Sequence, residues 1–176
     1  MTAPVLALDL ASVSGWAVGE PGGKPMHGSI RFAAKGASHE AIFHKAFLWA
    51  CKQIVDLEPG LIVWEAPLAG FKGGHTTVDV TTILFGLPAI VGAAAHMYQV
   101  YDVRKAETRD VRNHFIGCNP KRAKAKPLVM QKCRAMGWQV EDDNEADALA
   151  LWSFMCSLLD PKLAVVPTPL FQRGMR

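Results

Sequence analysis

The chain has 176 residues, of which 50% are hydrophobic and 20% are charged. A chain of this length can bury one sizeable core, and this composition excludes disordered and fibrous proteins. The formal net charge of +3 is unevenly distributed, because ten basic and two acidic residues between positions 104 and 134 give that segment +8 and leave −5 elsewhere. A basic segment in an otherwise acidic chain is consistent with a protein that binds a polyanion through its basic residues and cations through its acidic ones.

The four cysteines lie far apart and form no CxxC pair. They indicate free thiols in a reducing cytosol, with neither a zinc site nor a disulfide framework. The N-terminus has no charged start followed by a long apolar region, and the chain has no uninterrupted apolar run of about 18 residues. We therefore expect a cytoplasmic protein without a membrane span.

The first half of the chain is rich in strand signals. Apolar alternation predicts strands over residues 4–10, 15–19 and 28–32, which would form an antiparallel meander. Ser38 is expected to cap a helix over 39–57, and Pro59 with Gly60 is expected to end it. A fully apolar strand over 61–65 then precedes a glycine-rich loop over 66–75 and a helix of small residues over 80–97.

The second half is mainly helical. We predict a strand over 99–103, a helix over 109–116 capped by Thr108, a basic loop over 119–126, and helices over 127–136 and 143–159. The tail from residue 160 is expected to wrap the surface or to be flexible. Strands followed by alternating helices and strands predict an α/β protein with a mixed sheet.

Three carboxylates stand where the chain leaves or enters apolar segments. Asp9 ends the first apolar run, Glu65 ends Leu-Ile-Val-Trp, and Asp147 lies near the start of the last helix. Asp9 could instead cap a turn, and Asp147 could simply interact with the helix dipole. Because desolvating an anion is costly, carboxylates on three separate elements are best explained together by a shared cation, as in metal-dependent phosphate chemistry.

The segments around these carboxylates resemble the motifs of the RuvC Holliday junction resolvases, within the RNase H-like superfamily. The final motif, Glu-Ala-Asp-Ala-Leu-Ala over residues 145–150, is the most specific of them. The resemblance extends to about residue 159 and rests on Asp9 through Gly15-Trp16-Ala17, Val63-Trp64-Glu65, Val111-Arg112 with Gly117, Lys126-Pro127-Leu128-Val129 and Glu145 through Ala150.

The resemblance implies one RNase H-like nuclease domain over residues 1–176, with a mixed five-stranded sheet flanked by helices on both faces. It implies a magnesium-dependent endodeoxyribonuclease that resolves four-way junctions by paired hydrolysis, leaving 5′-phosphate and 3′-hydroxyl ends. In such enzymes carboxylates hold two Mg²⁺ ions, for which Mn²⁺ can substitute. Asp9 would bridge both ions, Glu65 and Asp147 would hold one each, and Lys126 would act at the scissile phosphate.

One position departs from the family pattern. Members usually have an acid or a histidine three residues before the last aspartate, and here that residue is Asn144. Asparagine can still ligate a metal through its carbonyl oxygen. Alternatively, Asp143 lies on nearly the same helix face as Asp147 and could take the place of the missing acid. Glu145 is expected to point elsewhere. We favour Asp143 as the fourth ligand and keep Asn144 as the alternative.

The basic segment and the glycine-rich loop supply the expected DNA contacts. Phe71 could stack on an unpaired base, and the helix over 80–97 could join two protomers of a homodimer on branched DNA. Two other functions remain open: a nuclease of this superfamily that acts on other branched DNA or on RNA, and a non-catalytic protein that binds junctions. The residues expected to contact DNA are Phe71, Arg112, Lys121, Arg122, Lys124 and Lys126.

Overall fold

The computed structural model describes residues 2–67 and 78–164. Its central feature is a five-stranded sheet in the order β3-β2-β1-β4-β5. The pairs β1–β2 and β2–β3 are antiparallel, whereas β1–β4 and β4–β5 are parallel. The strands are β1 (Val5–Asp9), β2 (Ser14–Gly19), β3 (Met26–Ile30), β4 (Leu61–Glu65) and β5 (Val103–Ala106).

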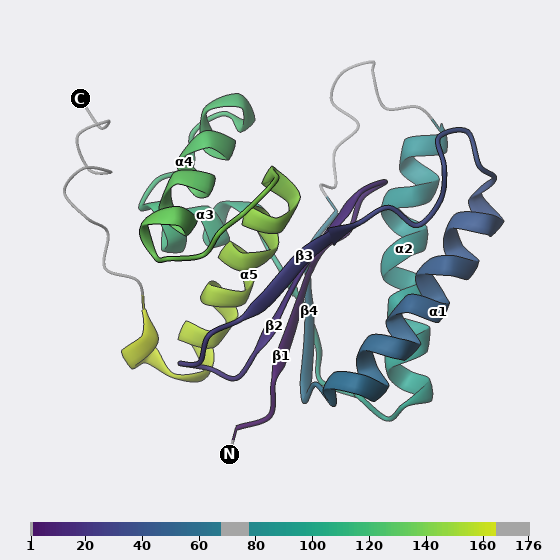
Figure 1. The fold of residues 1–176 in the computed structure, drawn as a ribbon, viewed down its shortest axis with the longest axis horizontal. Coiled ribbons are helices and arrows are strands. Elements are labelled where there is room, and N and C mark those ends of the chain that lie inside the picture. Colours follow the sequence, from purple (N-terminus) through teal and green to yellow (C-terminus); the bar gives the residue numbers. More distant parts are fainter. Residues whose placement is uncertain (1, 68–77, 165–176) are drawn as a thin grey trace.

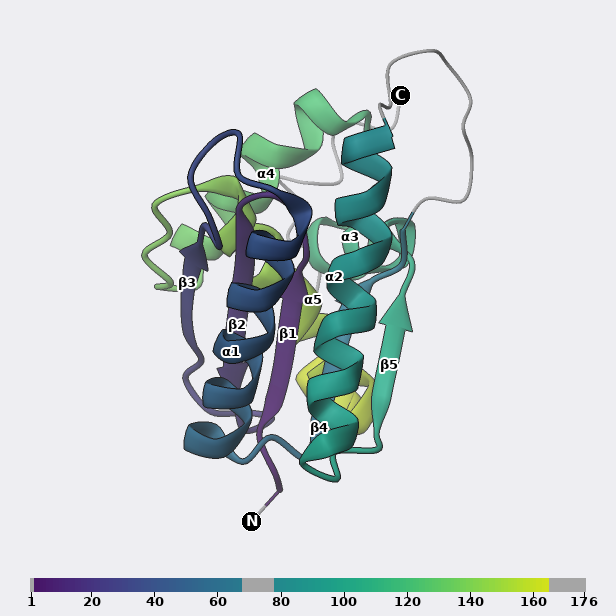
Figure 2. The ribbon, with the colours of Figure 1, turned by 90° about the vertical axis from the view of Figure 1, so that its right-hand side faces the viewer.

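Helices cover both faces of this sheet, which confirms the predicted α/β class and mixed sheet (Figure 1). On one face lie α1 (His39–Leu57) and α2 (Val78–Met97), side by side in front of the strands in Figure 2. On the other face lie α3 (Thr108–Ile116), α4 (Arg122–Ala135) and α5 (Asp143–Leu159). A short 3-10 helix, η1 (Pro161–Leu163), begins the predicted tail, whose residues from 165 lie outside the described part.

The alternation of side chains along β1 divides the core into two layers. Val5 and Ala7 pack into the layer beneath α3, α4 and α5, whereas Leu6 and Leu8 pack into the layer beneath α1 and α2. All four side chains are fully buried or nearly so. Since β1 is covered on both sides, its sequence is a continuous apolar run rather than an alternating one.

The helix α1 has the bounds that the sequence predicts. Its N-cap is Ser38, whose Oγ accepts a hydrogen bond of 3.3 Å from the amide of Ala41. Its C-cap is Glu58, which adopts a left-handed conformation with φ of 44° just before Pro59. The capping residues therefore set both ends of this helix.

Two predictions about the second half of the chain are wrong in their boundaries. The strand predicted over 99–103 is in fact β5 at Val103–Ala106, because residues 98–102 form the turn after α2. The basic loop predicted over 119–126 is mostly the first part of α4, which begins at Arg122 and contains Pro127 in its interior. Proline there removes one backbone hydrogen bond without ending the helix.

The helix α2 combines strong apolarity with partial exposure. It is the one helix in the described ranges that is long and apolar enough to cross a membrane, with a mean hydropathy of 1.8 over its best 18-residue stretch. Two of its glycines face the core: a Cβ on Gly86 would lie 2.2 Å from the Phe43 ring, and one on Gly92 would lie 3.7 Å from Trp64. The small residues of α2 thus let it pack closely on α1 and on the sheet.

Candidate active site

Strand register brings Asp9 and Glu65 to the same edge and the same face of the sheet. The strands β1 and β4 run parallel with Leu8 opposite Trp64, so their final carboxylates are neighbours. Asp9 follows the alternation of Val5 and Ala7, and Glu65 follows that of Leu61 and Val63, so both point toward the layer that contains α5. Their proximity therefore follows from two apolar runs, each ending in a carboxylate.

Gly15 allows the start of α5 to approach this edge. It pairs with Asp9 across the β1–β2 ladder. A Cβ on Gly15 would lie 1.9 Å from the backbone oxygen of Asn144, a distance that no side chain can occupy. Glycine at this position lets the first turn of α5 sit against the sheet, and Asp147 one turn later joins the two strand carboxylates.

The pKa values of all three carboxylates are raised, mainly by burial, and those of Asp9 and Asp147 are raised further by a neighbouring carboxylate. Burial, followed by the negative charges of Asp147 and Glu65, raises the pKa of Asp9 from 3.8 to about 7. Burial and the charge of Glu65 raise the pKa of Asp147 from 3.8 to about 6. Burial also raises the pKa of Glu65, although a hydrogen bond from Thr108 opposes it. The three side chains thus form one negatively charged cluster with incomplete compensation.

Three cations lie close enough to lower these pKa values. Arg122 acts on all three carboxylates, Arg112 on Glu65 and Asp147, and Lys126 on Asp9 and Asp147. They come from α3 and α4, on the same side of the sheet as α5. An acidic cluster with guanidinium and ammonium groups beside it can bind a phosphodiester together with divalent cations.

Lys126 also forms an ion pair with the carboxylate of Asp143. Both side chains are partly buried, so the pair fixes the ammonium group beside the carboxylate cluster. The side chain predicted as the fourth ligand is thus bound to the side chain predicted to act on the phosphate. Lys126 lies inside α4 rather than in the predicted loop, and its position is set by a helix.

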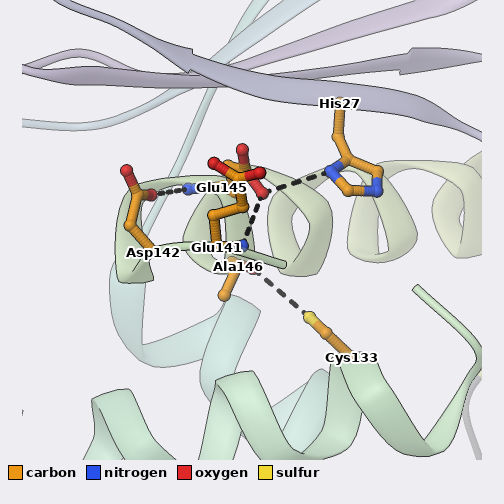
Figure 3. Close-up of polar contacts among 6 residues, drawn as sticks. All are labelled: His27, Cys133, Glu141, Asp142, Glu145 and Ala146. Carbon is orange, nitrogen blue, oxygen red and sulfur yellow. Dashed lines mark hydrogen bonds and ion pairs between the residues drawn. The ribbon is translucent and has the colours of Figure 1, made fainter. Parts of the chain in front are cut away.

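Other polar residues at the start of α5 contact the backbone around the helix start and the neighbouring strand β3 (Figure 3). Asp142 is the N-cap, and its Oδ1 accepts a 2.9 Å hydrogen bond from the amide of Glu145. The buried Glu145 accepts a 3.0 Å bond from the amide of Glu141 and lies 3.4 Å from Nδ1 of His27 on β3. Glu145 therefore points away from the carboxylate cluster. Against the effect of burial, hydrogen bonds from the amide of Glu145, the side chain of Ser29, and the amide and side chain of Asn144 hold the pKa of Asp142 below its usual range.

Not every residue predicted for DNA contact joins this group. Lys121 and Lys124 are exposed at the start of α4, and neither perturbs the pKa of the three carboxylates. Phe71 lies outside the described residues, as does most of the glycine-rich loop. Among residues 2–67 and 78–164, no three His, Cys, Asp or Glu side chains are already arranged to hold one ion.

Thr108 is a site residue with a role that the sequence did not indicate. It was expected to cap the helix over 109–116, but the N-cap of α3 is Glu107 and Thr108 is the first helical residue. Its hydroxyl donates a 2.8 Å hydrogen bond to Oε2 of Glu65. A hydroxyl residue before a helix usually indicates a cap, so only the pairing of β4 with β5 could have revealed this contact.

The fold resembles those of solved junction resolvases, although the sequences are distant. It matches the structure of Thermus thermophilus RuvC in complex with a Holliday junction substrate, with a TM-score of 0.69 and 13% identity over 92% of this chain and 98% of that one. A second Thermus thermophilus RuvC structure gives a TM-score of 0.65 and 14% identity over the same shares of the two chains. The yeast mitochondrial Holliday junction resolvase Ydc2 gives a TM-score of 0.58 and 13% identity over 88% of this chain and 78% of that one.

No protein-family model matches the sequence, and no curated protein matches it either. The structural similarity nevertheless extends over 92% of the chain. It confirms the resemblance that the motifs indicated. The chain has the RuvC-like resolvase fold.

Proposed function

We propose that the protein is a divalent-metal-dependent endodeoxyribonuclease that resolves four-way DNA junctions by paired phosphodiester hydrolysis, leaving 5′-phosphate and 3′-hydroxyl ends. The observation behind this proposal is the gathering of three largely buried carboxylates with raised pKa values, Asp9, Glu65 and Asp147, from β1, β4 and α5. Basic side chains border that cluster on a RuvC-like fold. The similarity to a RuvC structure that contains a Holliday junction substrate supports the choice of DNA.

The donor set fits Mg²⁺, with Mn²⁺ as a substitute. All three side chains offer oxygen, which hard divalent cations prefer. Their raised pKa values mark anions that lack sufficient positive charge nearby, and bound cations supply that charge. When present, a pair of such ions activates the attacking water and stabilises the leaving 3′ oxygen. Asp9, Glu65 and Asp147 would hold the ions, with Asp143 or Asn144 as a fourth ligand.

The basic residues of α3 and α4 would hold the DNA backbone. Lys126, kept in place by Asp143, would bind the scissile phosphate and stabilise the charge that develops on it. Arg112 and Arg122, which lie beside the carboxylates, would neutralise the negative charge of the bound phosphates. Lys121 and Lys124 are exposed at the start of α4 and would bind phosphates farther along the strand. Such contacts position DNA without reading its sequence.

The exposed side of α2 provides a surface for a homodimer. Phe85, Ala89, Ala93 and Met97 follow one another at four-residue intervals, and all four are exposed. Residues spaced in this way share one helix face, and two such apolar faces can pack around a two-fold axis. On this proposal the apolarity of α2 serves packing within a cytoplasmic dimer rather than a membrane, and the two sites of the dimer cut the two strands of the junction.

The test is digestion of a synthetic mobile four-way junction with and without Mg²⁺, beside a flap, a linear duplex and an RNA–DNA hybrid. We expect cleavage of the junction alone, and only with the metal. Asp9→Asn should abolish cleavage and retain junction binding, because basic side chains rather than carboxylates provide the salt-dependent affinity. Asp56→Asn is a matched control, since Asp56 is an exposed acid on α1 that pairs with Lys52.

Each alternative function has its own outcome in this assay. Preferred cleavage of the flap or the hybrid would replace the resolvase proposal by a nuclease with a different substrate. Junction binding without cleavage, at any Mg²⁺ or Mn²⁺ concentration, would identify a non-catalytic junction binder. Equal activity of Asp9→Asn and the parent protein would remove the carboxylate cluster from the mechanism.

The dimer is tested separately by light scattering after gel filtration. The parent protein is expected at twice the monomer mass, and Phe85→Glu is expected to shift it to the monomer by placing a charge in the apolar face. Leu48→Glu on α1 is a matched control, since Leu48 is equally exposed but lies outside the face of α2. A monomeric parent protein would contradict the proposed dimer.

A further inference from the structure

Within residues 2–67 and 78–164, Glu65 is the one carboxylate of the cluster with a side-chain hydrogen bond. The hydroxyl of Thr108 donates to its Oε2 at 2.8 Å, and both residues are partly buried. A hydroxyl that donates to one oxygen of a carboxylate restrains the orientation of the group and leaves the other oxygen available. Thr108 therefore controls which part of Glu65 faces the cluster.

The fold leaves little freedom in this contact. Glu65 pairs with Ala106 across the parallel ladder, and the amide of Ala66 donates a 2.8 Å bond to the carbonyl of Ala106. Only Glu107 separates that ladder from Thr108, so the start of α3 is tied to the end of β4. The N-cap Glu107 makes no side-chain capping bond, and the hydroxyl of Thr108 is directed to Glu65 instead.

The same helix face bears a second group that acts on Glu65. Arg112 is one turn after Thr108, and its positive charge lowers the pKa of Glu65. The amino end of α3 also presents a partial positive charge toward the carboxylate. Three features of α3 thus attract the Glu65 carboxylate, and the Thr108 hydroxyl is the one that forms a direct hydrogen bond with it.

We propose that Thr108 is a positioning residue that presents the Oε1 oxygen of Glu65 to a divalent cation. The inference rests on the proposed function, since it requires Glu65 to be a ligand. Groups that orient metal ligands through hydrogen bonds typically change metal affinity by 10- to 100-fold when they are removed. Thr108 touches neither the metal nor the DNA in this role.

The experiment measures Mn²⁺ binding directly, by the loss of the free-ion signal in electron paramagnetic resonance, without DNA. Thr108→Val removes the hydroxyl and keeps the shape of the side chain, whereas Thr108→Ser keeps the hydroxyl. We expect Thr108→Val to weaken Mn²⁺ binding about tenfold or more, and Thr108→Ser to bind within about twofold of the parent protein. Junction cleavage should show the same order, with a higher Mn²⁺ requirement for Thr108→Val.

Thr82→Val is the matched control, because the hydroxyl of Thr82 donates a 2.9 Å bond to the carbonyl of Val78 in the first turn of α2. It removes a comparable hydroxyl on the opposite face of the sheet and should not alter Mn²⁺ binding. Thermal unfolding without metal identifies any variant that does not fold, and Thr108→Ala then replaces Thr108→Val. Thr108→Ala is expected to weaken Mn²⁺ binding by the same factor as Thr108→Val.

The outcomes separate this inference from the proposed function. A parent protein that binds Mn²⁺ and cleaves the junction, with Thr108→Val binding equally well, would overturn the role of Thr108 alone. A parent protein that binds no Mn²⁺ would overturn both. Equal loss of binding in Thr108→Val and Thr108→Ser would show that packing, rather than the hydroxyl, is responsible, and would also overturn the inference.

Discussion

Asp9→Asn should make the protein more stable at pH 8 in the absence of divalent cations. The carboxyl of Asp9 has a pKa of about 7 in the folded protein and an ordinary value of 3.8. The folded state therefore binds this proton more tightly than the unfolded chain does. Stability is highest below pH 4 on this account, falls as the pH rises from about 4 to 7, and is lowest above that range.

The size of the effect follows from this difference. Each pH unit corresponds to about 1.4 kcal/mol, so a shift of about three units sets an upper limit on the order of 4 kcal/mol. The side chain is partly exposed, and solvent screening reduces the effect to about 2–4 kcal/mol. Asparagine has the shape of the neutral acid, so Asp9→Asn should recover this free energy of unfolding at pH 8 and almost none at pH 4.

The assay is urea unfolding of the parent protein and of Asp9→Asn with a chelator, at pH 8 and at pH 4. Addition of Mg²⁺ at pH 8 should reduce the difference in free energy of unfolding between the two proteins, because an ion that binds only the folded parent protein stabilises it by mass action. Equal free energies of unfolding for the two proteins at pH 8, or a difference between them that is the same at both pH values, would refute the argument from buried charge.

Three further predictions concern other parts of the site. Arg112→Ala should weaken junction binding and reduce the slope of log affinity against log salt by about 0.9, as expected for one lost phosphate contact, and an unchanged slope would assign Arg112 a structural role. Asp143→Asn should raise the Mg²⁺ concentration for half-maximal cleavage, and a titration that overlays the parent's would exclude Asp143 as a ligand. Gly15→Ala should destabilise the protein by about 1–3 kcal/mol in thermal or urea unfolding, because its Cβ would meet a backbone oxygen of α5. Gly92→Ala, whose Cβ would be in ordinary contact, is its control, and equal stability of the two variants would contradict the close approach.

The sequence predicts the fold best where the local pattern and the tertiary environment agree. The bounds of α1 follow from Ser38 and from the proline and glycine after it, and the strand ending at Glu65 is a continuous apolar run between breakers. The strand β5 is harder to place, because Val103–Ala106 has two adjacent charged residues, Arg104 and Lys105, and no apolar alternation. Pro127 also resembles a helix start, although α4 begins five residues earlier.

The candidate site also has features that the sequence predicts and features that it does not. Asp9, Glu65 and Asp147 stand out in the sequence because each is a carboxylate at the end of an apolar element. The contact between Thr108 and Glu65 depends on the β4–β5 register, and the ion pair of Lys126 with Asp143 depends on how α4 packs on α5. Such pairings between distant segments leave no local pattern in the chain.

The pairing of β1 with β4 has a consequence for folding kinetics. These parallel strands become neighbours only after α1 has crossed over between them, and the third carboxylate arrives with α5, near the end of the chain. No local segment contains the carboxylate cluster, so it forms only through contacts with large separation in sequence, which are slow to close. Recovery of metal binding during refolding should therefore report the completion of the whole sheet rather than the earlier formation of individual helices.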